Sequence, residues 1–176
     1  MNHPIESLKQ EHRVIERGLD SLDELCRSLS TSDPAIRARL GELARFFREY
    51  ADRLHHAKEE DMLFSAMADH GFSPDSGPIF VMLAEHDIGR RHVRYLREIA
   101  GGEGPLTRDE VARIQENATS FCALLRSHIQ KEDTVLYPAA VQALPEAVLS
   151  ELATAFVEFD RSAETDDLRA LVEDNR

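Results

Sequence analysis

The sequence predicts an all-α protein, an up-down-up-down four-helix bundle with a C-terminal helical extension. Apolar residues recur at spacings of three and four along several long stretches, which is typical of amphipathic helices. No segment alternates polar and apolar residues over enough positions to indicate a strand. Short runs rich in Gly, Pro or Ser divide the chain into four long stretches with short connections, the pattern of an up-down bundle.

The first two predicted helices form one hairpin. The first begins near Pro4, a favourable first helical residue, and runs to a turn at residues 30–32. The second begins with Asp33 as its N-cap, has a proline behind it, and continues to Gly71. Residues 71–78 are then expected to form an ordered loop.

The next two predicted helices form a second hairpin. The third begins near Pro78 and ends at the glycine-rich residues 101–104. The fourth is capped by Thr107, because Glu110 three residues later completes a capping box. We expect this helix to end at Pro138 or slightly past it.

Beyond the bundle the chain carries an extension. A fifth amphipathic segment follows Pro145, and the acidic tail after it contains one more short apolar run, from Leu168 to Val172. We therefore divide the chain into a four-helix bundle over residues 1–142 and an extension over residues 143–176. The extension is a helix and an acidic tail that pack on the bundle or trail from it.

Charge and composition exclude several classes of function. The chain has 21 Lys and Arg against 33 Asp and Glu, a net charge of −12, which argues against general binding of nucleic acid or anionic lipid. No stretch approaches the roughly 18 to 20 consecutive apolar residues of a membrane span, and no signal-peptide core is present. Cys26 and Cys122 lack the spacing of a thiolate metal site. The sequence therefore predicts a cytoplasmic protein without membrane or nucleic-acid partners.

Histidine and glutamate recur along the chain in a regular order. A lone histidine in the first helix is followed by His-x-x-x-Glu in the second, and the same pair of features recurs in the third and fourth helices. The second lone histidine follows the first by 74 residues, and the second His-x-x-x-Glu follows the first by 73. The candidate metal ligands in this repeat are His12, His55, Glu59, His86, His128 and Glu132.

Hairpin geometry brings the four repeated histidines to one level of the bundle. Counted from a turn near residue 32, His12 lies 20 residues back and His55 lies 23 residues forward, so both are roughly 30 to 35 Å along antiparallel helices. In the second hairpin, His86 and His128 lie 18 and 24 residues from a turn near residue 104. Residues four apart share a helix face, so each His-x-x-x-Glu pair points the same way.

Imidazoles and carboxylates gathered inside a bundle indicate a metal site, because an unpaired buried carboxylate is costly to desolvate. Two histidines could bind each of two ions, with Glu59 and Glu132 bridging between them. Nitrogen and oxygen ligands without a thiolate favour iron, with manganese or zinc as the alternative metals.

The order of these residues resembles that of the hemerythrin-like, or HHE, cation-binding domain. The resemblance rests on the doubled motif, in which Leu-Phe or Leu-Tyr-Pro follows each His-x-x-x-Glu, and it covers roughly residues 1–142. It implies an α-helical bundle around a non-heme di-iron centre. When the ligand positions of the family are matched to this chain by motif, the resemblance implies the six candidates above as the iron ligands.

Two positions depart from the oxygen-carrying members of that family. Those proteins have another histidine one turn after the third-helix histidine, where this chain has Arg90. Their last carboxylate lies five residues after the fourth-helix histidine, at Asp133, so Glu132 and Asp133 compete for the bridge, and the repeat favours Glu132. The chain thus resembles the four-histidine branch of the family. Glu16, at the repeat position of Arg90, either ligates iron or forms an ion pair with Arg90.

Some polar side chains lie outside the repeat. His56 is about 100° around the helix from His55, so we expect it to face the helix boundary. A His56/Glu60 pair, one residue out of register, is the main alternative. Three further side chains are open candidates to hydrogen-bond a bound ligand: Tyr50, Tyr95 and Tyr137.

These residues and the resemblance together predict a protein that holds two non-heme iron ions, bridged by oxo or hydroxo. Its expected partner is a small diatomic ligand or peroxide, so that it binds or senses dioxygen, nitric oxide or peroxide in oxidative or nitrosative stress. Turnover of peroxide or nitric oxide would make it an enzyme. The alternatives are iron storage or donation for iron–sulfur cluster repair, and a metal-free helical interaction module. A homodimer through the last helix is also an open alternative.

Overall fold

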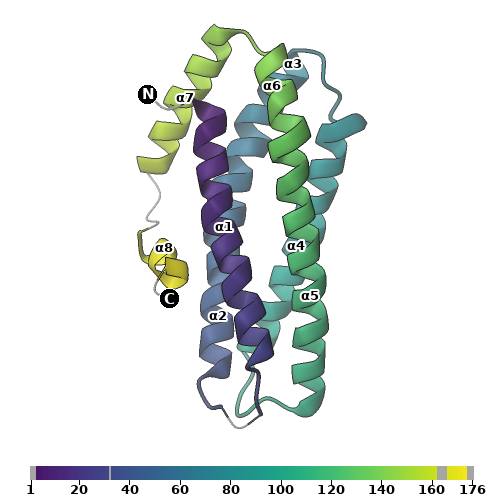
Figure 1. Cartoon of the computed structure of the whole chain (residues 1–176), viewed down its shortest axis with the longest axis vertical. Coiled ribbons are helices and arrows are strands. Elements are labelled where there is room, and N and C mark those ends of the chain that lie inside the picture. The colour runs from purple at the N-terminus through teal and green to yellow at the C-terminus, as the bar shows by residue number, and fades with distance from the viewer. Residues whose placement is uncertain (1–2, 32, 162–165, 174–176) are drawn as a thin grey trace.

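The computed structural model describes residues 3–31, 33–161 and 166–173, and over these ranges the chain is helical and contains no strand. Four antiparallel rods lie side by side (Figure 1), which confirms the predicted fold class. The first and third rods are single helices, whereas the second and fourth combine α-helix with π-helix, written η. The bundle elements are α1 (Pro4–Arg27), α2 (Ile36–Phe46), η1 (Phe47–His56), η2 (Glu59–Leu63), α3 (Phe64–Asp69), α4 (Gly77–Ala100), α5 (Arg108–Lys131), η3 (Glu132–Leu136) and α6 (Tyr137–Ala143).

Local signals set the start of α5 and delay the start of α2. The hydroxyl of Thr107 accepts the backbone N–H of Glu110, whose carboxylate accepts the N–H of Thr107, so the predicted capping box starts α5. The second rod becomes helical at Ile36, two residues later than an N-cap at Asp33 predicts. The carboxylate of Asp33 instead accepts the N–H of Ala35 in a turn that precedes the helix. Part of the predicted first turn, Ser32, lies outside the described residues.

Two short π-helices, η2 and η3, begin at the same level of the bundle. Glu59 begins η2 and Glu132 begins η3, so the two short π-helices follow the sequence repeat. The longer η1 precedes η2 in the second rod only. A π turn is wider than an α turn and is frequent at functional sites. Here it allows the consecutive residues His55 and His56 to be buried together.

Two apolar clusters fill the bundle on either side of this level. One lies toward the α1–α2 turn and includes Leu22, Leu40 and Phe47. The other lies toward the opposite end and includes Leu8 and Met67. Each rod passes from one cluster through a short polar segment into the other, so the polar residues between them are closed off from water at both ends.

The extension lies against the outer side of α1 (Figure 1) as α7 (Glu146–Arg161) and α8 (Asp166–Glu173). Phe156 of α7 is buried in one apolar cluster, whereas Leu168 and Val172 of α8 are buried in the other. The rest of the predicted acidic tail, at positions 162–165 and 174–176, lies outside the described residues. The division into two domains stays a prediction.

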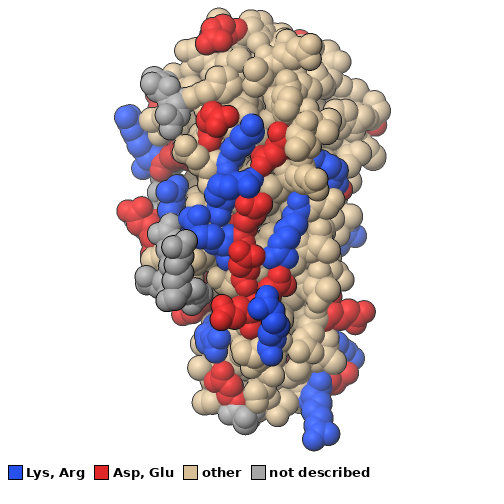
Figure 2. Space-filling view, in the orientation of Figure 1, with Lys and Arg blue, Asp and Glu red and all other residues tan. Residues whose placement is uncertain are grey.

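Acidic and basic side chains are mixed over the face that α1 and α5 present (Figure 2). Arg126 of α5, for example, forms ion pairs with Asp20 and Asp23 of α1. Among the described helices, none combines the length and the apolar character that a membrane crossing requires.

Candidate metal centre

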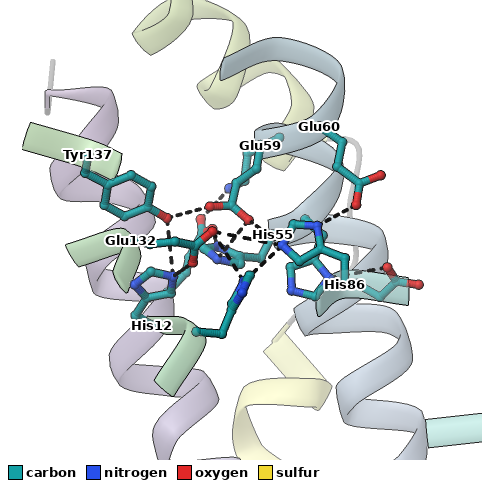
Figure 3. Close-up of polar contacts among 12 residues, drawn as sticks. His12, His55, Glu59, Glu60, His86, Glu132 and Tyr137 are labelled. Atoms are coloured by element: carbon teal, nitrogen blue, oxygen red, sulfur yellow. Dashed lines mark hydrogen bonds and ion pairs between the residues drawn. The ribbon is translucent and has the colours of Figure 1, made fainter. Parts of the chain in front are cut away.

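A buried layer of histidine and glutamate crosses the middle of the bundle (Figure 3). All six predicted residues lie in it, and none is more than 2% exposed. His56 lies there as well, with its ring stacked on His86 at 3.8 Å between centroids. The prediction that His56 faces the helix boundary is therefore wrong. It assumed an α-helical step, whereas this part of the second rod is π-helical.

The seven side chains form two groups of closely spaced ligand atoms. The first comprises His12, His55, Glu59 and Glu132, and the second comprises His56, Glu59, His86 and His128. Within each group the ligand atoms all lie within 4.8 Å of one another. Glu59 belongs to both groups, so two cation sites would be adjacent and share a carboxylate.

Both glutamates reach toward the two groups. Glu59 Oε2 lies 3.6 Å from the Nε2 atoms of both His55 and His86. Glu132 places Oε2 at 3.2 Å from His12 Nε2 and Oε1 at 3.3 Å from His128 Nε2. Each carboxylate is therefore in position to bridge two ions.

Every histidine of the layer is oriented by a carboxylate behind it. An ionised carboxylate can only accept a hydrogen bond, so each Nδ1 carries a hydrogen, and each Nε2 offers a lone pair to a metal when the ring is neutral. Such pairing fixes the ring and leaves Nε2 to bind a metal. The Nδ1-to-carboxylate distances are 2.8 Å for His12 and Asp133, 2.9 Å for His55 and Glu11, 3.4 Å for His56 and Asp52, 2.6 Å for His86 and Glu60, and 2.9 Å for His128 and Glu85.

A cation holds each of these outer carboxylates in turn. Arg90 donates both to Asp52 at 2.8 Å and to Glu60 at 2.7 Å, and so supports two histidines at once. The remaining pairs are Lys58 with Glu11, Lys131 with Glu85, and Arg13 with Asp133. The outer carboxylates are thus neutralised by lysine and arginine, whereas within the residues that the structure describes the two inner glutamates contact only histidines as basic partners.

The inner glutamates lack sufficient partners. Within the described residues, Glu59 Oε2 and both carboxylate oxygens of Glu132 are buried without a hydrogen bond. Burial, followed by the charge of Glu132, raises the pKa of Glu59 well above its usual value. Burial also raises the pKa of Glu132, but His128 and His12 more than offset this, and the pKa lies well below its usual value. The two carboxylates can both carry charge only when cations lie between them.

The spacing of the nitrogens also suits a metal. His86 Nε2 and His128 Nε2 lie 3.0 Å apart, within hydrogen-bonding distance. Burial lowers the pKa of His128, but Glu132 and Glu85 outweigh it and raise the pKa to about 9, so a metal bound at this Nε2 would displace a proton. Two nitrogens at about 2.1 Å from one ion and at right angles around it are about 3 Å apart. The spacing of these histidine nitrogens therefore fits two ligands of one metal ion.

The comparison with known families agrees with this donor set. Residues 3–140 match the family described as the hemerythrin HHE cation binding domain. The chain belongs to this family. Three curated relatives are 26% identical over 153 residues, and all are described only as uncharacterized proteins, one from Mycobacterium bovis and two from strains of Mycobacterium tuberculosis. The match covers 86% of this chain and 58% of each relative, so the chain spans less than two thirds of their length.

One tyrosine of this HHE domain lies at the metal centre. The Tyr137 hydroxyl donates to Glu59 Oε1 at 2.7 Å and lies 3.3 Å from His12 Nε2 (Figure 3). Its ring stacks on His12 with 5.4 Å between centroids. Of the other two candidates, Tyr50 is buried next to Arg169 and Tyr95 lines a pocket on α4 and α5. Tyr137 thus adjoins the two-histidine group.

The structure places the residues that the sequence left open. Asp133 contacts Nδ1 of His12 on the outer side, while the neighbouring Glu132 points to the centre. The ion pair between Glu16 and Arg90 is not formed, because Glu16 pairs with Arg13. Arg90 has nearer carboxylates in the outer layer, as described above.

Sequence reasoning missed most of the outer carboxylates of the HHE domain. A signal was present for two of them, because Glu11-His12 recurs as Glu85-His86 in the second hairpin. Asp52 carried no such signal, since position 125, its counterpart in the repeat, is Leu125.

Proposed function

We propose that this HHE domain is a non-heme di-iron protein that reacts with a small ligand, namely dioxygen, nitric oxide or peroxide, in oxidative or nitrosative stress. The convergence of five histidines on two buried glutamates, three of whose four carboxylate oxygens lack a hydrogen bond, carries the proposal. His12 and His55 would hold one iron, and His56, His86 and His128 the other, with Glu59 and Glu132 bridging. The proposal therefore uses five histidines in place of the four of the branch that the sequence resembles.

The two groups differ in their number of histidines, so the two ions that they would hold would differ in their coordination. One group has three histidines and the other has two, so an ion in the two-histidine group would have fewer protein ligands and more coordination positions for an exogenous ligand. Tyr137 holds Glu59 beside that group through its hydroxyl. An iron pair would supply the redox chemistry toward oxygen, nitric oxide or peroxide, while the oriented imidazoles tune its potential.

Burial of the layer favours small ligands and retained metal. Its seven residues are at most 6% exposed, and apolar clusters close the bundle at both ends. A large organic substrate could not reach the centre through either end of the bundle. The same closure argues against ready release of iron, which the storage and donation alternative requires.

Ligand substitutions test the assignment. His56→Gln should reduce bound iron from about two to about one per chain, because the three-histidine group loses a ligand. His70→Gln is the matched control, since His70 is an exposed residue at the end of a helix, with Nδ1 at 2.8 Å from the carbonyl oxygen of Ala66. Unchanged iron content in His56→Gln, or in both Glu59→Gln and Glu132→Gln, would contradict the seven-ligand arrangement.

Reactivity of the iron-loaded protein tests the function. Nitric oxide, dioxygen and hydrogen peroxide would be added separately to the dithionite-reduced protein, and the visible and electron paramagnetic resonance spectra recorded. A stoichiometric spectral change with one of them supports the proposal, and many turnovers of peroxide per iron would identify an enzyme. No response to any of the three, with rapid transfer of iron to an apo iron–sulfur acceptor, would favour iron donation instead.

A further inference from the structure

A cavity of about 240 Å³ opens beside the metal centre, between η1, α4 and α5. His56 and Glu85 line it at the level of the polar layer, and Arg94 and Arg97 line it farther along α4. The volume lies near the lower end of the range for small-molecule sites. The cavity thus connects the outside of the bundle with the side of His56.

The walls between those ends are apolar. Phe47 and Phe121 meet edge to face at 4.9 Å between ring centroids, and Val93 and Leu125 complete this part of the lining. Such walls suit the hydrocarbon part of a ligand better than a free inorganic ion, which would keep its hydration shell.

Gly89 leaves open space in the middle of α4 on the cavity side. A Cβ at this position would lie 3.7 Å from the nearest ring atom of Phe121, an ordinary contact, so the packing of the protein does not require glycine. Glycine inside a helix is less favourable than alanine. The residue therefore weakens the helix while keeping the cavity wide.

Positive charge is in excess around the cavity, although the chain as a whole is strongly acidic. Four arginines line it, at positions 48, 90, 94 and 97, against the carboxylates of Asp52 and Glu85. Both carboxylates are already engaged, Asp52 by Arg90 and Glu85 by Lys131. Within the described residues, Arg94 and Arg97 form no ion pair, and both side chains are exposed.

We propose that this cavity binds a small organic monocarboxylate with an apolar body. Arg94 and Arg97 bind the carboxylate, for which planar guanidinium groups are well suited. The apolar body lies over Gly89, between Val93 and Phe121, and ends beside His56. This ligand site adjoins the metal sites at His56 and goes beyond the proposed reaction with small inorganic molecules.

Binding of hexanoate tests the proposal. Isothermal titration calorimetry would be performed on the iron-loaded and the metal-depleted protein, with hexan-1-ol as the uncharged probe of matched length. We expect saturable binding of hexanoate in both forms and at least tenfold weaker binding of hexan-1-ol. Nuclear Overhauser contacts from the hexanoate methyl group to Val93 and Phe121 would locate the ligand.

Three variants separate this site from general attraction of anions. Arg94→Gln/Arg97→Gln should weaken hexanoate binding at least tenfold, and Gly89→Leu should abolish it by filling the cavity. Arg91→Gln/Arg108→Gln removes the same charge from exposed positions outside the cavity and should leave binding unchanged. Absence of saturable binding, equal affinity for hexan-1-ol, or equal weakening by the two arginine pairs would overturn the proposal. Hexanoate binding is measured with and without iron. A negative result would therefore overturn the carboxylate site without bearing on the di-iron assignment.

Discussion

Lys58 and Lys131 occupy corresponding positions in the two halves of the bundle but differ in burial. Lys58 is fully buried, and its Nζ contacts Glu11 of α1 and Asp160 of α7. The side chain of Lys131 contacts Glu85 and is 37% exposed. We predict that Lys58→Met destabilises the protein far more than Lys131→Met, although the two substitutions are chemically identical.

The magnitude follows from what each lysine leaves behind. Removing one partner of a buried ion pair costs about 3 to 5 kcal/mol, because the other charge stays buried. The Glu11 side chain is only 5% exposed, whereas that of Asp160 is 41% exposed and can return to water, so the lower end of this range applies. The pair of Lys131 and Glu85 is partly open to water, at 37% and 16% exposure of the side chains, so it is closer to a surface pair, which contributes at most about 1 kcal/mol. For a chain of this length, about 3 kcal/mol corresponds to a fall in Tm of about 6 to 12 °C.

Urea unfolding followed by circular dichroism at pH 7 would measure both variants at the same metal content. The double variant Glu11→Gln/Lys58→Met should recover part of the loss, because it removes the stranded charge. Equal losses in the two single variants, or a loss below 1 kcal/mol for Lys58→Met, would refute the reasoning from burial.

Three further predictions concern packing, acid stability and metal binding. Gly18→Ala should destabilise the protein, by about 1 to 3 kcal/mol, since its Cβ would lie 2.3 Å from the Phe46 ring. Gly89→Ala should instead stabilise the protein by up to about 1 kcal/mol. Chemical denaturation of both variants would measure these opposite changes in the free energy of unfolding. The backbone of Thr107, then Arg37, lower the pKa of Glu110 from 4.5 to about 2, so its stabilising effect is complete above about pH 4.5 and is lost toward pH 2. Urea midpoints of the wild type and Glu110→Gln should therefore converge as pH falls from 5 to 3, and a constant difference would contradict this. Removal of metal by a chelator should lower the Tm, because bound cations compensate the buried charges of the inner glutamates, and calorimetry with and without metal would detect it.

The repeat in the sequence was sufficient to predict the fold and the position of the centre. Each hairpin fixes the height of two histidines, and spacing by four fixes the direction of each His-x-x-x-Glu pair. Those rules depend only on regular helices and hold for His12, His86 and His128. They place Glu59 and Glu132 at the same level, where the structure has them facing each other.

The features that the sequence did not predict arise where the helices are irregular or where distant elements meet. His56 faces the centre because η1 is π-helical, and the residue types alone did not signal that winding. The partners of Arg90 depend on how α4 packs beside η1 and η2, not on sequence spacing. The burial of Lys58 depends on α7, which packs from outside the repeat.

Metal content per chain, measured on protein grown with iron, tests the central claim most directly. The visible spectrum would be recorded aerobically and after dithionite on the same sample. The account predicts about two irons per chain and a near-ultraviolet band of an oxo-bridged pair that bleaches on reduction. No bound metal, or a single tightly held zinc without a chromophore, would contradict it.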